Sequence, residues 1–261
     1  MFILYSPGFY LYFMLLFVIS SFGRPPFASS ADYFNFPNMI HVADNCTPKK
    51  IGIVNYSTGN TASVGYFLDR LGLDHQLVST PDDLIHCDAA ILPGVGHYHT
   101  AYQSLMSSGL FAEIKRLSGV GFPVIGICLG FQLMTLGSEE SPFDPGLNIF
   151  PFSTVEIKPQ LPNFKVPHIG WNSLDVTTSD TPLFHQIIPG VSRFFFANRF
   201  GVKLNTSSNV SQALYTHSGQ WIAIAHSGNA LGLQFHPEKS RSNGYTIVNN
   251  FFNLVFNRNL L

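Results

Sequence analysis

Charged residues are scarce in this chain of 261 residues, and the few that occur nearly cancel. Asp, Glu, Lys and Arg make up 11% of the sequence, and the formal net charge at pH 7 is -1. A nucleic-acid-binding surface needs a basic patch, and a disordered acidic tail needs a run of carboxylates; the sequence contains neither. The composition therefore predicts one domain with an ample hydrophobic core and no nucleic-acid partner.

Cysteine is also rare, with only Cys46, Cys87 and Cys128 in the whole chain. Their spacing forms no disulfide framework and no metal-binding pair, and the ten histidines lack ligand spacing as well. No internal repeat and no phosphate-binding glycine loop occurs. The sequence therefore predicts no metal and no cofactor, and it favours a reducing, cytoplasmic compartment.

Residues 1–50 lack the basic residues that an export signal carries before its apolar run. The apolar stretch from Phe9 to Phe22 is short for a membrane span and close to the length of a signal core. Three interpretations are open: an export signal, a membrane anchor, or residues upstream of a true start such as Met39. We favour the third, because the domain predicted over residues 51–261 resembles a cytosolic enzyme; membrane attachment then requires that the segment be retained.

The most informative stretch is Val124-Ile125-Gly126-Ile127-Cys128-Leu129-Gly130. It predicts a buried strand, a sharp turn at the cysteine and a helix from Gly130 onwards, because glycines two before and two after the cysteine permit a tight backbone. Such an elbow exposes the sulfur, and the helix N-terminus favours the thiolate and offers N–H groups to an oxyanion. Taken alone, the window is equally compatible with a buried cysteine that only fills space.

A second stretch, Leu231 to Ser240, favours the chemical interpretation. An apolar strand ends at His236, and the carboxylate of Glu238 follows two residues later. A thiol nucleophile needs a base, and the base needs an orienting group, so Cys128, His236 and Glu238 together predict a triad assembled by the fold. A His-x-Glu pair without the cysteine elbow is more often a surface pair.

Alternating strand and helix patterns predict an α/β fold with a mainly parallel open sheet flanked by helices and a β-rich C-terminal half. Strands are expected at 51–55, 75–79, 89–92, 154–157, 193–196, 212–215 and 221–225, and helices at 61–71 and 245–256. The strand at 89–92 runs into Pro93-Gly94-Val95-Gly96. This loop is either an ordinary turn or, because glycines allow close approach of the backbone, a source of an oxyanion N–H opposite the elbow.

These motifs together resemble class I, triad-type glutamine amidotransferases. The resemblance rests on Gly126 to Gln132 and on Gln234 to Glu238. Further motifs narrow it to the glutaminase subunit of imidazole glycerol phosphate synthase and its close paralogues: Leu92-Pro-Gly-Val-Gly96, Ser138-Glu-Glu140, Pro167-His-Ile-Gly-Trp-Asn172 and His236-Pro-Glu-Lys-Ser240. It covers about residues 51 to 256.

The resemblance implies hydrolysis of glutamine to glutamate and ammonia through a thioester on Cys128, with His236 as base and acid and Glu238 as its orienting partner. It implies that the N–H groups of Leu129 and of the loop Gly94, Val95 and Gly96 hold the oxyanion, and that Gln132 and Glu139 hold the glutamine. The ammonia then passes to a partner synthase, in the family a (β/α)8 barrel acting on a phosphoribosyl aminoimidazole nucleotide.

One segment departs from the family pattern. Where the family has Tyr-Phe-Val-His-Ser-Tyr, this chain has Phe195-Phe-Ala-Asn-Arg-Phe200. The substitution predicts that Arg199 contacts the α-carboxylate of glutamine, crowds the pocket, or faces solvent. Two alternative functions stay open: a paralogue that supplies ammonia to a sugar-amidating enzyme of surface polysaccharides, and a non-catalytic binding subunit that lost turnover through Arg199.

Overall fold

The computed structural model describes residues 49–56, 60–159, 165–176, 181–204, 210–217 and 219–256. Apart from its last two residues, the predicted N-terminal extension 1–50 lies outside the described residues, so its three interpretations stay predictions. None of the helices in the described part of the chain combines the length and the apolar character that a membrane span requires.

A mixed sheet forms the centre of the fold, with strands in the order β2-β1-β3-β4-β14-β13-β11-β7-β5-β6. β12 pairs with β13 and β9, while β8 and β10 form a separate antiparallel pair. The strands are β1 (Lys50–Val54), β2 (Asp74–Val78), β3 (Ala89–Leu92), β4 (Val124–Ile127), β5 (Gly137–Ser138), β6 (Ser141–Pro145), β7 (Thr154–Glu156), β8 (His168–Ser173), β9 (Asp175–Val176), β10 (Arg193–Asn198), β11 (Phe200–Lys203), β12 (Ser211–Thr216), β13 (Gln220–Ser227) and β14 (Ala230–Leu233).

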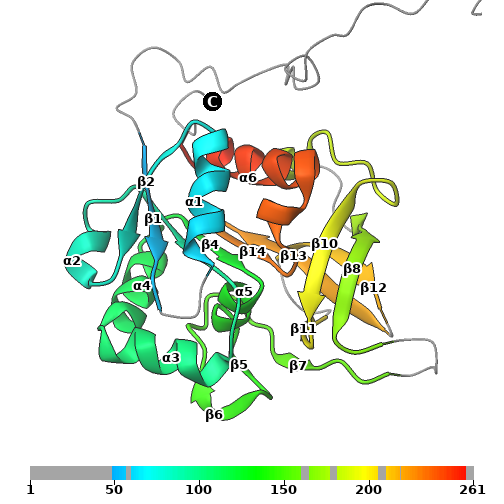
Figure 1. Ribbon diagram of the computed structural model, residues 1–261, viewed down its shortest axis with the longest axis horizontal. Coiled ribbons are helices and arrows are strands. Elements are labelled where there is room, and N and C mark those ends of the chain that lie inside the picture. Colours follow the sequence, from blue (N-terminus) through cyan, green and yellow to red (C-terminus); the bar gives the residue numbers. More distant parts are fainter. Residues whose placement is uncertain are drawn as a thin grey trace, which may run out of the picture. The chain divides into compact units, whose positions relative to one another are not determined.

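Helices cover the parallel part of the sheet on both faces. They are α1 (Thr61–Arg70), α2 (Pro81–Leu84), α3 (Tyr98–Ser107), α4 (Leu110–Gly119), α5 (Leu129–Leu133) and α6 (Arg241–Phe256), with 3-10 turns at Pro182–Phe184 and Pro237–Lys239. The first and last helices, α1 and α6, lie side by side (Figure 1). The rings of Phe67 and Tyr245 stack there with centroids 4.6 Å apart.

The parallel strands are buried on both faces, which explains their short, wholly apolar sequences. In β3, for example, Ile91 packs in a cluster with α1 and α6, whereas the adjacent Leu92 packs in a cluster with α3, α4 and α5. Successive side chains of a strand point to opposite faces, so one strand contributes to both layers. Each face thus receives its own hydrophobic core.

The sheet brings the predicted chemical motifs to one edge. β4 pairs in parallel with β3 through Leu92 and Gly126, and with β14 through Ile127 and Leu233. The segments that follow these three strands therefore emerge together at the carboxyl ends, where α/β folds place their ligands. The predicted fold class is confirmed, including the β-rich C-terminal half.

Candidate active site

Cys128 lies on a strained turn between β4 and α5. Its backbone adopts φ +48° and ψ -102°, a conformation that L side chains rarely take. Such strain persists where the surrounding structure enforces it, and it is typical of a nucleophile at a strand-to-helix elbow. This outlier distinguishes Cys128 from a cysteine that only fills space.

The two glycines around the cysteine are required by packing. A Cβ on Gly126 would lie 2.4 Å from Met134 Sδ and 2.6 Å from Phe131 N. A Cβ on Gly130 would lie 2.0 Å from the backbone oxygen of Leu92. Neither position has space for a side chain, so the elbow is as tight as the sequence pattern predicts.

The helix after the elbow is shorter than its predicted role requires. α5 has only five residues, Leu129 to Leu133. Few aligned peptide dipoles add up over such a length, so the expected stabilisation of the thiolate by the helix N-terminus is small.

The loop after β3 lies directly against the elbow. A Cβ on Gly94 would stand 1.7 Å from the backbone oxygen of Ile127 and 2.8 Å from Leu129 N. Val95 and Gly96 form the exposed tip of the loop. The structure therefore places the predicted oxyanion segment beside the amide of Leu129, while the roles of its N–H groups stay a prediction.

His236 and Glu238 form a buried pair after β14. Nδ1 of His236 is 2.8 Å from Oε1 of Glu238, and the two side chains are only 2% and 4% exposed. Because Nδ1 is engaged by the carboxylate, Nε2 is the ring nitrogen left for the sulfur of Cys128. This is the order of groups that a Cys-His-Glu triad requires.

The electrostatics of the site favour an imidazolium. Burial lowers the pKa of His236, but the charge and hydrogen bond of Cys128 and those of Glu238 raise it by more. The net result is a pKa of His236 raised to about 10. At neutral pH the ring therefore favours its positively charged form beside the sulfur of Cys128. A cationic imidazole next to a thiol is the arrangement that nucleophilic cysteine catalysis uses.

Backbone bonds to β10 hold the histidine in place. His236 N donates to Phe195 O at 2.9 Å, and Ser240 Oγ donates to His236 O at 2.6 Å while accepting from Phe195 N at 3.0 Å. The local sequence does not reveal this support, because it depends on the pairing of segments about 40 residues apart.

The residues expected to hold glutamine are engaged with the protein itself. Gln132 is 5% exposed, and its Nε2 donates to the carbonyl of Phe200 at 3.0 Å. Glu139 is exposed, and its carboxylate accepts from the backbone N–H of Glu156 at 2.9 Å. Their contacts with a substrate stay predictions. Within the described ranges, no group of three or more His, Cys, Asp or Glu side chains is arranged to hold a metal ion.

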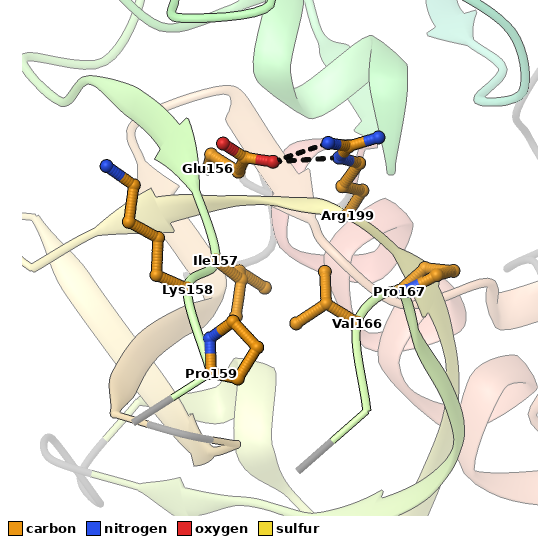
Figure 2. A pocket seen from close by; sticks show the side chains of 7 residues that line it. All are labelled: Glu156, Ile157, Lys158, Pro159, Val166, Pro167 and Arg199. Carbon is orange, nitrogen blue, oxygen red and sulfur yellow. Dashed lines mark hydrogen bonds and ion pairs between the residues drawn. The ribbon is translucent and has the colours of Figure 1, made fainter. Parts of the chain in front are cut away.

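Arg199 is paired with Glu156. Its Nε and Nη2 atoms lie 2.9 and 2.7 Å from Oε1 of that carboxylate (Figure 2). The pair borders a surface hollow that is also lined by Ile157, Lys158, Pro159, Val166 and Pro167. Arg199 thus has a carboxylate partner within the protein, and the expected contact with the α-carboxylate of glutamine stays a prediction.

The candidate site is closed in this conformation. Cys128 is 6% exposed and His236 is 1% exposed. The Gly94 to Gly96 loop abuts the elbow and reaches the surface at Val95 and Gly96.

Comparison with known proteins agrees with this geometry. The chain matches the model of the family "Glutamine amidotransferase class-I" over residues 54–255. It is 35% identical over 206 residues to the imidazole glycerol phosphate synthase subunit HisH of Listeria monocytogenes serotype 4a (strain HCC23), covering 79% of this chain and 96% of that protein. It is 38% identical over 198 residues to the HisH subunit of Synechococcus sp. (strain CC9902), covering 76% of this chain and 91% of that protein.

Solved structures share the fold at lower identity. PurLQS from Thermotoga maritima superposes with a TM-score of 0.63 at 22% identity, over 80% of this chain and 100% of that chain. The glutaminase domain of CTPS from Trypanosoma brucei, with bound acivicin, superposes with a TM-score of 0.51 at 14% identity, over 80% of this chain and 94% of that chain. At such identities the likeness concerns the fold alone.

Proposed function

Since the chain belongs to the class-I glutamine amidotransferases, and within them to the HisH subunits of imidazole glycerol phosphate synthase, we infer that it hydrolyses glutamine and supplies the ammonia to the synthase. The observation that carries the reaction is the arrangement at the sheet edge. A strained cysteine lies beside a buried His236–Glu238 pair whose pKa shift favours the imidazolium. No observation favours the sugar-amidating paralogue or the non-catalytic subunit.

In the reaction we propose, the Cys128 thiolate attacks the side-chain amide carbon of glutamine. The negative charge moves to the amide oxygen, where the N–H groups of Leu129 and of the Gly94 to Gly96 loop stabilise it, typically by about 3 kcal/mol per donor. His236 then gives its proton to the departing nitrogen. Ammonia leaves, and a γ-glutamyl thioester remains on the sulfur.

The second half of the reaction restores the enzyme. Neutral His236 takes a proton from water, and the resulting hydroxide attacks the thioester carbon. The sulfur leaves as a thiolate, glutamate is released, and His236 is again an imidazolium held by Glu238. In each cycle His236 gives one proton to ammonia and recovers one from water, and the γ-carboxyl group of the product loses its proton to solvent.

Binding of the synthase subunit is the event that we expect to open the site. We propose that this subunit is a (β/α)8 barrel, that it meets this chain in the cytoplasm as a heterodimer, and that it turns the exposed loop at Val95 and Gly96 into its productive conformation. If the productive conformation has a population of roughly 0.1–10% in the lone chain, a partner that makes it fully populated raises glutaminase turnover by tenfold to a thousandfold.

The corresponding experiment measures glutamate formation by the chain alone and with the histidine-pathway synthase subunit. We expect the lone chain to be slow and the partner to raise its turnover at least about tenfold. Amide-labelled glutamine should then yield labelled imidazole glycerol phosphate. Full activity of the lone chain, unchanged by the partner, would contradict the proposal.

Arg199 offers a test of the departure from the family pattern. We predict that Arg199→Ser raises the KM for glutamine about tenfold, the value of an interaction worth about 1.4 kcal/mol. The expected reason is that the guanidinium exchanges Glu156 for the substrate carboxylate, because an exposed ion pair is weak. Steady-state glutaminase kinetics with the partner present measure this.

A matched control is available in α4. Arg116 forms a comparable exposed pair with Glu113, at 2.6 Å, within helix α4. Arg116→Ser should leave the KM unchanged. If Arg199→Ser behaves like Arg116→Ser, Arg199 has no role in binding glutamine; a lower KM would show instead that Arg199 crowds the pocket.

A further inference from the structure

A chain of buried side-chain amides leads from a backbone carbonyl to the sulfur of Cys128. Gln132 Nε2 donates to Phe200 O at 3.0 Å and to Gln234 Oε1 at 3.4 Å. Gln234 Nε2 donates in turn to Cys128 Sγ at 3.6 Å. Gln234 is completely buried. A buried amide is costly unless its polar atoms are bonded, so these contacts hold both glutamines in fixed orientations.

Gln132, the first residue of this series of hydrogen bonds, sets the direction of every bond in the series. The carbonyl of Phe200 can only accept, so Gln132 must turn its NH2 group towards it. The second hydrogen of the same group goes to Gln234 Oε1, which leaves the NH2 group of Gln234 facing the sulfur. Asn198 Nδ2 also donates to the Phe200 carbonyl, at 2.9 Å, and keeps it in place.

The sulfur has partners that favour opposite protonation states. The backbone carbonyl of Ala197, 4.0 Å from Sγ, can accept a hydrogen only from the neutral thiol. The amide of Gln234 can only donate, and a donor stabilises the charged form of the group that accepts. Since the short helix α5 adds little, Gln234 is a neutral side chain placed to stabilise the thiolate.

We propose that Gln234 is a positioning residue for the nucleophile: its amide N–H orients Cys128 Sγ and stabilises the thiolate, and Gln132 keeps that amide in the donating orientation. The inference rests on the proposed function, because it deepens the account of the same sulfur. It gives Gln132 a structural task in the free enzyme, beside the expected contact with glutamine.

The other titratable groups facing Cys128 do not compete with this role. His236, with Glu238 behind it, is the charged partner already described. The hydroxyl groups of Tyr56 and Tyr215 are buried, and burial first and then the charge of Cys128 raise the pKa of each. Both tyrosines therefore stay protonated at neutral pH and place no charge beside the sulfur.

The test is the reactivity of Cys128 as a function of pH in the full-length chain. Gln234→Met keeps the length of the side chain and removes the donor. Iodoacetamide alkylation of the Cys128 peptide, followed by mass spectrometry, should then rise with a midpoint about one pH unit higher than in the parent, as expected for the loss of a bond to a charged group. Glutaminase kcat with the partner should fall about tenfold at neutral pH, with the KM changed little.

A matched control pair exists elsewhere in the chain, because Gln76 Nε2 donates to Cys87 Sγ at 3.3 Å. Gln76→Met should leave the Cys128 midpoint at the parental value. Gln132→Met supplies a second arm, since loss of the orienting bond should shift the midpoint in the same direction by a smaller amount.

Folded Gln234→Met and Gln132→Met proteins that both keep the parental midpoint would overturn the proposal. Alkylation requires neither glutamine nor the synthase, so it is independent of the proposed function. A raised midpoint in a chain without glutaminase activity would refute that function and retain the role of Gln234.

Discussion

Replacing Cys128 by serine should reduce ammonia release from glutamine by at least about a thousandfold while the chain still folds. A hydroxyl has a far higher pKa than a thiol, so the imidazole of His236 cannot convert it into a comparable nucleophile. The fold should survive, because the smaller hydroxyl still has polar partners around it in the Gln234 amide and the Ala197 carbonyl. Glutamate formation in the presence of the synthase subunit measures the loss.

Cys87→Ser is the matched control for this experiment. Cys87 is buried to a similar extent, at 8% exposure, and it also contacts a glutamine side chain. Its substitution should leave turnover near the parental rate. Near-parental turnover of Cys128→Ser would remove the cysteine from the reaction, and an equal loss in both variants would point to a general effect of cysteine removal on folding.

The second large effect is expected at Gly94. Gly94→Ala should lower kcat about a hundredfold or more, because small displacements of catalytic groups cost that much. The added Cβ would stand 1.7 Å from the backbone oxygen of Ile127, and neither backbone can yield without moving the elbow. Overpacking by the added methyl group should also destabilise the protein by about 1–3 kcal/mol. Steady-state kinetics with the partner and thermal unfolding measure the two effects.

Gly119 provides the comparison for Gly94. It ends α4, and a Cβ added there meets nothing within 4 Å. Gly119→Ala should therefore leave kcat unchanged and stability equal or slightly higher, since alanine loses less backbone entropy in a helix. If Gly94→Ala proves as harmless as Gly119→Ala, the loop does not abut the elbow in the active enzyme.

The strands and helices predicted from local pattern are largely confirmed, because buried strands are short apolar runs whatever surrounds them. β3 (Ala89–Leu92) has the predicted bounds, and α6 begins four residues before its predicted start at Tyr245. The pattern did not predict α3 (Tyr98–Ser107), whose buried positions are Tyr98, Ala101 and Leu105. Its sequence mixes residues of modest helix propensity, so packing decides its conformation.

The candidate triad was accessible to sequence reasoning because each part has its own local signature: glycines around a cysteine, and a histidine with a carboxylate at a strand end. The role of Gln234 could not be predicted in this way, although this residue lies two residues before His236. Its role depends on the distance to Cys128 and on Gln132, which only the pairing of β4 with β14 brings together.

Arg199 is a second residue whose partner could not be predicted from the local sequence. Its charge suggested a partner in the glutamine, whereas the pairing of β11 with β7 sets Phe200 opposite Glu156 and gives Arg199 a carboxylate of the protein. The partner of an exposed charged side chain depends on strand register, and local sequence does not contain that register.

The most direct test of the central claim, that the Cys128 thiolate attacks glutamine, is labelling of the full-length chain with an electrophilic glutamine analogue in the presence of the synthase subunit. Peptide mass spectrometry should find the covalent adduct on Cys128, and excess glutamine should prevent it. An adduct on Cys46 or Cys87 instead, or no adduct on Cys128 while glutamine is still hydrolysed, would contradict the account.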